Sequence, residues 1–221
     1  SLSLAFYLEG IFQTHSSFQL FVYAIKIPFK LFLLFHPFKN NNLMLHVFIE
    51  KHLSLNFSKT ENMKKLNRIG LDKEQSKMLA EKLNELLADY QVFYMNARGF
   101  HWNIKGDKFF ELHIKFEELY NDSLIKIDEI AERVLTLGHT PLHTYTDYLK
   151  LSKVKEAKNV SDGSEAISLI LKGYEVLLPL ERELLELSAD SNDEGTNALM
   201  SDYIREQEKL VWMYSAYLSN N

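Results

Sequence analysis

The chain of 221 residues contains no cysteine, and it has only four prolines and eight glycines. Without cysteine there is no disulfide framework, and there is no thiolate to favour copper(I) or an iron–sulfur cluster. A reducing, cytoplasmic setting is the expectation for such a chain. Residues 108–137 contain neither proline nor glycine, the two residue types that most often break a helix. This stretch therefore predicts one long helix.

Residues 1–62 differ in composition from the remainder of the chain. They hold ten of the fifteen phenylalanines, no arginine, no aspartate and only three glutamates, and their apolar runs lack clear helical or strand periodicity. We expect this leader to be translated upstream sequence, or disordered, and to lie outside the fold, with the native protein beginning at Met63. A membrane-associating extension is the alternative.

One stretch of this leader, residues 18–38, is apolar enough to suggest a membrane span. Lys26, Pro28 and Lys30 cut it into pieces shorter than the roughly 20 residues that a span needs. A cleavable signal also fits poorly, because a positive N-terminal region and a clean small-residue cleavage site are missing. We therefore expect no membrane partner.

The domain expected over residues 63–221 is acidic, with 20 lysines and arginines against 27 aspartates and glutamates. Backbone binding to nucleic acid needs lysine and arginine to displace phosphate counterions, so this charge argues against a general nucleic-acid binder. It suits a protein that attracts cations instead.

Four long helices are predicted in this domain. The first begins at Asp72, which makes a capping-box pattern with Gln75, and runs toward His101. The second covers residues 108–137 and ends at Gly138, a residue type that commonly terminates helices.

The third helix is expected to begin at Asp162 and to run to about Leu187, and the fourth to open at Asp193 and to run to Leu218. A connection of about two dozen residues, long for a compact domain, separates the second helix from the third and holds a short helix around residues 147–153. The pattern predicts an all-α, ferritin-like four-helix bundle with a short extra helix in the long connection between helices two and three.

Two pairs of metal-type residues lie at helical spacing on the second helix. His113 and Glu117 are four residues apart, as are Asp128 and Glu132, so each pair shares a helix face. The two pairs are roughly 22 Å apart along the axis, whereas ligands lie within ~2.5 Å of their ion. One copy therefore cannot close the site, but an antiparallel second subunit would bring its Asp128 and Glu132 opposite His113 and Glu117. His101 is then a further ligand.

Taken singly, each of these residues also has an explanation that involves no metal. A histidine near a helix end commonly caps or packs, and the carboxylates could be solvated or paired with neighbours such as Lys126 or Arg133. Together, histidine and carboxylate ligands suit iron(II), manganese or zinc rather than calcium, and the spacing does not fix the element.

A longer motif surrounds these positions. It comprises His101-Trp102-Asn103-Ile104, Gly106, Phe109, Leu112-His113, Phe116-Glu117, Tyr120, Asp128 and Ala131-Glu132-Arg133. In order and spacing this run resembles the Dps-like mini-ferritins, and the resemblance covers residues 63–221. It implies a hollow shell of twelve identical subunits that oxidises iron(II), preferentially with hydrogen peroxide, stores the ferric mineral and so protects against oxidative damage.

The resemblance also implies a two-iron ferroxidase centre at the two-fold subunit interface. His101, His113 and Glu117 would come from one subunit, and Asp128 and Glu132 from its partner. Glu117 stands where many relatives have aspartate, and either residue offers a hard oxygen ligand. The Glu-x-x-His motif of ordinary bundle ferritins does not occur here, which favours the intersubunit arrangement.

Residues outside the ligand set have two further expected roles. The resemblance suggests Trp102 as an electron donor for stray radicals, with a packed interface aromatic as the alternative. Asp193, Glu194 and Asp202 could line a three-fold pore that admits iron. The first two are also expected at that position simply as charges at a helix N-terminus.

A DNA-compacting role with little ferroxidase activity is the rival function. The tail after Met63 offers only Lys64, Lys65 and Arg68 before the first helix, and residues 217–221 contain no basic side chain. Twelve short tails acting together would give weak DNA binding at low salt.

Overall fold

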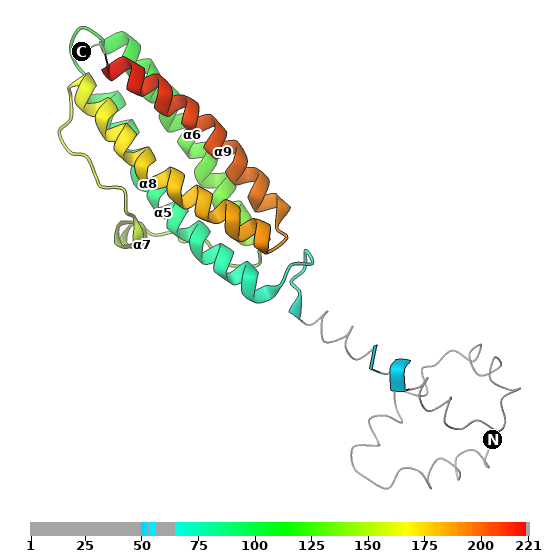
Figure 1. Cartoon of the computed structure of the whole chain (residues 1–221). Helices are drawn as coiled ribbons and strands as arrows, with labels where there is room; N and C mark the ends of the chain where they lie inside the picture. The colour runs from blue at the N-terminus through cyan, green and yellow to red at the C-terminus, as the bar shows by residue number, and fades with distance from the viewer. Residues whose placement is uncertain (1–49, 53, 56–64, 220–221) are drawn as a thin grey trace, which may run out of the picture. The chain divides into compact units, whose positions relative to one another are not determined.

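The computed structural model describes residues 50–52, 54–55 and 65–219, and helices α5 to α9 lie in the unit formed by residues 61–221 (Figure 1). The predicted leader lies almost entirely outside the described residues, so its interpretation stays a prediction. None of the helices in the described part of the chain combines the length and apolarity that a membrane span requires. The helices of the unit are α5 (Lys73–Asn103), α6 (Phe109–Thr136), α7 (Tyr145–Leu151), α8 (Gly163–Asp190) and α9 (Glu194–Leu218).

Acidic side chains begin three of the four long helices where the sequence predicts them. Asp72 accepts hydrogen bonds from two backbone N–H groups in the first turn of α5, at 2.9 and 3.1 Å. Asp162 caps α8 and Asp193 caps α9 in the same way, at 2.8 and 3.0 Å. Helix α6 is followed by Gly138 at a φ of +92°, a left-handed conformation that glycine adopts without steric cost.

The short helix begins two residues earlier than predicted. It spans Tyr145–Leu151, because the Thr144 hydroxyl accepts a hydrogen bond from the backbone N–H of Asp147 at 3.2 Å and so caps the helix. Ser152 is extended, with φ −61° and ψ 134°, and ends it.

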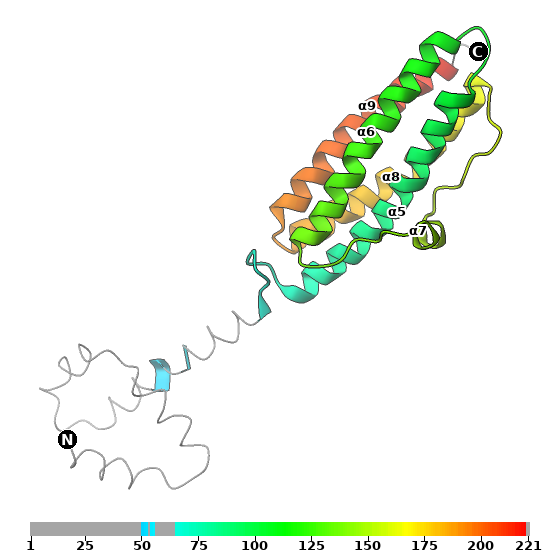
Figure 2. The ribbon, with the colours of Figure 1, turned by 180° about the vertical axis from the view of Figure 1, so that it is seen from behind.

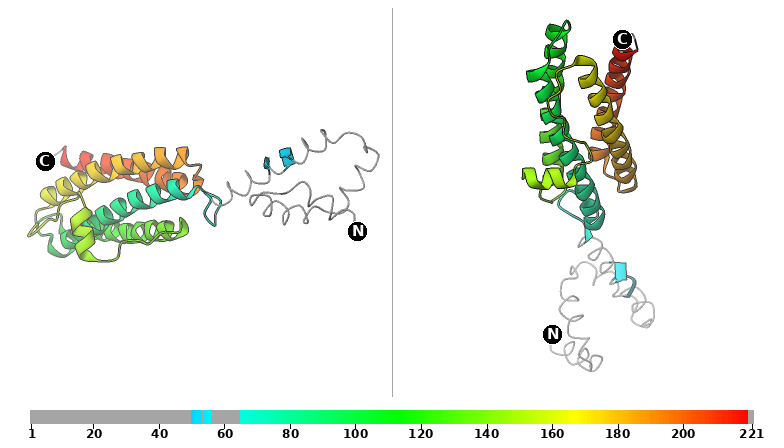
Figure 3. Two further views of the ribbon diagram at one scale, coloured as in Figure 1. Left: turned by 90° about the horizontal axis from the view of Figure 1, so that it is seen from below. Right: turned by 90° about the vertical axis from the view of Figure 1, so that its left-hand side faces the viewer.

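The long helices form two hairpins. Helix α5 packs beside α6, and α8 packs beside α9 (Figures 1 and 2). Contacts between α5 and α8 join the hairpins, and α7 packs against α5 across the direction of the long helices (Figure 3). This is the predicted four-helix bundle with one long connection. All four helices contribute to its core, with Leu83, Tyr90, Phe116, Ile130, Leu177 and Tyr203 among the buried side chains.

Three polar side chains of α5 hold the long connection in place. Asn84 and Asn96 each donate from the side-chain amide to one backbone carbonyl of the connection and accept from one of its N–H groups. Asp89, only 1 % exposed, accepts from the Ser152 hydroxyl at 2.9 Å and from two backbone N–H groups. These bonds satisfy backbone groups of a segment that has little regular structure of its own.

Candidate metal centre

The two predicted histidine ligands lie face to face. His101 is in the last turn of α5 and His113 is near the start of α6, and the loop between the helices turns at Gly106, whose φ is +98°. The two imidazole rings stack with their centroids 3.8 Å apart and 20° between their planes. The helical hairpin thus brings the two predicted ligands into direct contact within one chain.

Backbone hydrogen bonds fix the orientation of both rings. Nδ1 of His101 lies 2.8 Å from the carbonyl oxygen of His113, and Nδ1 of His113 lies 2.9 Å from that of His101. A carbonyl oxygen can only accept, so each Nδ1 carries the hydrogen and donates it. In the neutral imidazole this leaves a lone pair on Nε2, which is the arrangement by which a second hydrogen bond prepares a histidine for metal binding.

Two aromatic rings support the histidine pair. The Phe109 ring stacks on His113 with a centroid distance of 5.1 Å, and Tyr120 meets His101 edge-on at 5.3 Å. The pair is therefore held by packing as well as by hydrogen bonds, and both imidazoles are half-buried.

Helix α6 carries seven acidic side chains, which fall into two groups. Glu111, Glu118 and Asp122 form ion pairs with lysines three or four residues away, and Glu129 accepts a hydrogen bond from the Tyr203 hydroxyl at 2.6 Å. The other three are exposed and have no ion pair or side-chain hydrogen bond within the described residues. They are Glu117, Asp128 and Glu132, the three predicted carboxylate ligands.

One chain does not bring the two predicted ligand pairs together. Asp128 lies fifteen residues beyond His113 on the continuous helix α6, and no group of three or more histidine or carboxylate side chains in the described residues converges to hold an ion. The separation agrees with the argument from spacing, and the contribution of a second copy stays a prediction.

Comparison with known proteins gives the family. Residues 80–221 match the ferritin family as a ferritin-like domain. The chain is 42% identical over 156 residues to a DNA protection during starvation protein of Porphyromonas gingivalis, with 70% of this chain and 98% of the relative covered. The chain belongs to the Dps-like mini-ferritin family. This membership confirms the resemblance and the all-α, ferritin-like fold.

Further relatives of this Dps-like chain agree over the same extent. An uncharacterised protein of Haemophilus influenzae is 59% identical over 148 residues, which are 67% of this chain and 92% of the relative. The solved structure of a Dps protein from Vibrio cholerae O1 has a TM-score of 0.69 and 56% identity, over 70% of this chain and 97% of that chain. That protein is described as a member of a broad superfamily of ferritin-like diiron-carboxylate proteins.

Trp102 of this Dps-like chain is 55% exposed, and its ring forms a cation–π contact with Arg98. The Arg98 guanidinium is 4.8 Å from the centre of its ring and also donates to the Tyr94 hydroxyl at 2.8 Å. Sequence reasoning missed Arg98, although the spacing of four residues from Tyr94 to Arg98 and on to Trp102 was an available signal. These contacts are consistent with both the packed-aromatic and the electron-donor interpretations of Trp102.

The predicted pore residues comprise one buried and two exposed side chains. Asp193 is 2% exposed, caps α9 and forms an ion pair with Arg133. Its carboxylate is used inside the subunit, which favours the helix-terminal alternative over a place in a pore lining. Glu194 and Asp202 are exposed, and Asp202 pairs with Arg205 at 2.8 Å.

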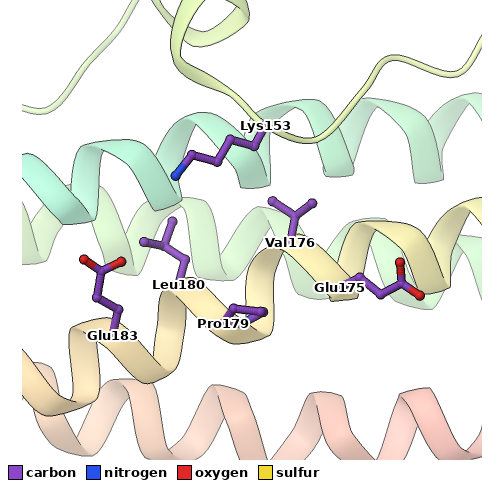
Figure 4. A pocket seen from close by; sticks show the side chains of 6 residues that line it. All are labelled: Lys153, Glu175, Val176, Pro179, Leu180 and Glu183. Carbon is purple, nitrogen blue, oxygen red and sulfur yellow. The ribbon is translucent and has the colours of Figure 1, made fainter.

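A surface pocket of about 300 Å³ lies between the long connection and α8 (Figure 4). It is lined by Lys153, Glu175, Val176, Pro179, Leu180 and Glu183. None of these residues belongs to the predicted site, so the pocket adds no ligand to the candidate centre.

Proposed function

We propose that this chain is a ferroxidase that oxidises iron(II), with hydrogen peroxide as the preferred oxidant, and stores the ferric product in a hollow shell of twelve subunits in the cytoplasm. One observation carries the proposal: the three α6 carboxylates without a partner are those that the spacing predicts as ligands. Carboxylate oxygens and imidazole nitrogens suit iron(II). Iron is then both substrate and cargo, and removing iron(II) together with peroxide protects against oxidative damage.

The proposed two-iron centre lies between two subunits related by a two-fold axis. His101 and His113 bind through Nε2, and Glu117 binds from the same subunit. Asp128 and Glu132 of the partner subunit complete the centre. Fifteen residues of α-helix span roughly 22 Å, so a single copy cannot supply all five ligands to one site, whereas a two-fold pair forms two equivalent centres.

A pair of iron ions matches the chemistry of peroxide. Each iron(II) gives one electron and hydrogen peroxide takes two, so two iron(II) ions and one peroxide give two iron(III) ions and two hydroxide ions. Delivering both electrons at one place avoids the one-electron cleavage of peroxide that releases hydroxyl radical. The carboxylates favour the product side, because their negative charge stabilises iron(III) more than iron(II).

Other residues have accessory roles in this proposal. Trp102 gives an electron to radicals that escape the centre. Glu194 and Asp202 are the exposed candidates for a pore that admits iron, with Asp193 the weaker candidate because its carboxylate is buried against Arg133.

DNA compaction is the second candidate function, and the name of the Porphyromonas gingivalis relative, a DNA protection during starvation protein, favours it. The excess of seven acidic over basic side chains in residues 63–221 argues for weak binding at most. A mobility-shift experiment with duplex DNA at low and at physiological salt tests this role.

Stopped-flow absorbance tests the ferroxidase proposal. The full chain is loaded with iron(II) without oxygen and then mixed with peroxide or oxygen, while ferric product is followed. We expect formation well above the rate in buffer, faster with peroxide than with oxygen, at two iron ions per peroxide. A rate no higher than that of buffer would remove the ferroxidase activity and leave DNA compaction as the better candidate.

A further inference from the structure

The centre of the bundle contains a fully buried carboxyl group. Glu181 of α8 is 0% exposed, and its Oε1 accepts hydrogen bonds from the Tyr90 hydroxyl at 2.9 Å and from Nε2 of Gln207 at 2.5 Å. Nε2 of Gln207 also donates to the Tyr90 oxygen at 2.7 Å. Since Tyr90 lies on α5 and Gln207 on α9, three helices contribute to one closed triangle of polar side chains, all at most 1% exposed.

Donors and acceptors in this triangle do not balance. The single hydrogen of Tyr90 and both side-chain N–H hydrogens of Gln207 are used, whereas Oε2 of Glu181 and Oε1 of Gln207 are buried without any hydrogen-bond partner. An ionised carboxylate only accepts, and two neutral donors on one of its oxygens compensate poorly for burying a full charge. A proton on the carboxyl group would remove this buried charge.

No basic side chain within the described residues forms an ion pair with Glu181. Lys126 of α6 acts on it only at a distance, because its ammonium group is bonded to Asp122 and Glu206. Arg182 of α8 is likewise bonded to Glu208, at 2.7 Å. Among the described residues, neutral side chains that interact with the carboxyl are Tyr90 from α5, Tyr174 from α8, and Gln207 and Tyr203 from α9.

We propose that Glu181 is a proton-binding site in the bundle core, which at mildly acidic pH the folded chain keeps in the neutral acid form and which loses its proton when the bundle opens. Ferritin-like bundles with a metal centre in the core surround it with glutamates and histidines. Here the neighbours are an amide and phenols, which suit a neutral acid and offer no second anionic ligand to a metal ion. This site is independent of the proposed iron chemistry.

The proton site links stability to pH with a definite sign. Burial raises the pKa of Glu181 from 4.5 to about 7, against the lowering effects of its two hydrogen bonds and of the distant Lys126 and Arg182 charges. Between these two pH values the folded chain binds more protons than the unfolded chain, so this group makes the bundle less stable as the pH rises toward 7. The contribution of Glu181 to stability is complete below pH 4.5, the ordinary pKa, and is lost above about pH 7, the raised pKa.

Infrared spectroscopy of the full chain tests the protonation state directly. We expect the C=O stretching band of a buried protonated carboxylic acid in the wild type, lost in Glu181→Gln and retained in Glu175→Gln, an exposed glutamate on the same helix (Figure 4). The band should disappear with a midpoint near pH 7. Absence of the band from the wild type at mildly acidic pH would overturn the proposal.

Unfolding by urea as a function of pH gives a second, independent measurement. We expect Glu181→Gln, whose amide imitates the neutral acid, to lose the part of the pH dependence that Glu175→Gln keeps. Tyr90→Phe should move the infrared midpoint to higher pH, because it removes a donor that favours the ionised form. Identical pH slopes in the wild type and in Glu181→Gln would contradict the proposal. So would a metal ion that copurifies with the wild type and is lost in that variant.

Discussion

His101 and His113 each donate a hydrogen bond from Nδ1 to the other's backbone carbonyl oxygen, at 2.8 and 2.9 Å. The bonds link the end of α5 to the start of α6, and they occupy Nδ1 of each ring. In the neutral imidazoles both Nε2 atoms are thereby left as acceptors, so the proposed binding of iron(II) there requires little reorganisation.

Neighbouring glutamates on α6 provide a matched pair of substitutions. Glu117 has no partner within the described residues, whereas Glu118 pairs with Lys115 at 2.6 Å. We expect Glu117→Gln to lower the rate of iron(II) oxidation by at least roughly 10- to 100-fold, the effect known for losing only a supporting residue of a metal site. Glu118→Gln should leave the rate within about a factor of two of the wild type. Equal rates for the two variants would remove Glu117 from the ligand set.

Mixed shells test whether two subunits share each centre. One variant lacks the imidazoles (His101→Ala with His113→Ala), and the other lacks the carboxylate charges of its Asp128 and Glu132 (Asp128→Asn with Glu132→Gln). Each shell alone should be inactive. After dissociation and reassembly together, a mixed pair contains one intact centre and one that keeps only Glu117 of the five ligands, so activity should return. No recovery in shells verified as mixed would argue for a site within one subunit.

The proposed electron-donor role of Trp102 can be separated experimentally from a packing role. Trp102→Phe keeps an aromatic ring, so the proposal expects unchanged iron oxidation but more oxidative damage to the protein under iron and peroxide. Trp212→Phe is the control, because Trp212 is also exposed, at 68%, and lies on a different helix, α9. Mass spectrometry of oxidised residues measures the outcome, and equal damage in the two variants would leave Trp102 as a packing residue.

Asp193 should matter for stability more than for iron uptake. Its carboxylate caps α9 and is the buried partner of Arg133, so Asp193→Ala removes a cap and leaves a partly buried guanidinium unpaired. We expect a loss of about 2–4 kcal/mol in the free energy of unfolding by urea. Asp202→Ala breaks only an exposed pair and should cost less than about 1 kcal/mol. A slower iron uptake in folded Asp193→Ala shells at unchanged stability would restore the pore interpretation.

The sequence by itself determined the helices and the identity of the candidate ligands. Helix ends depend on neighbours close in the chain, such as the Asp72 carboxylate and the N–H groups two and three residues on, so local patterns predict them well. Helix α7 begins two residues before its predicted start, because the Thr144 side chain caps it there. The spacing of four between His113 and Glu117 likewise follows from helical geometry alone.

Only the tertiary structure decided which polar groups are free and which are occupied. The mutual hydrogen bonds of His101 and His113 depend on how the hairpin closes, and the burial of Asp193 depends on α6 packing against the start of α9. Glu181 falls on the apolar stripe of α8, four residues after Leu177 and three before Leu184, but this spacing does not show which groups surround it. Its burial arises from contacts with Tyr90 and Gln207, 91 and 26 residues away along the chain. Periodicity shows which face of a helix is apolar, but long-range packing determines whether a polar side chain on that helix faces water, a partner or the core.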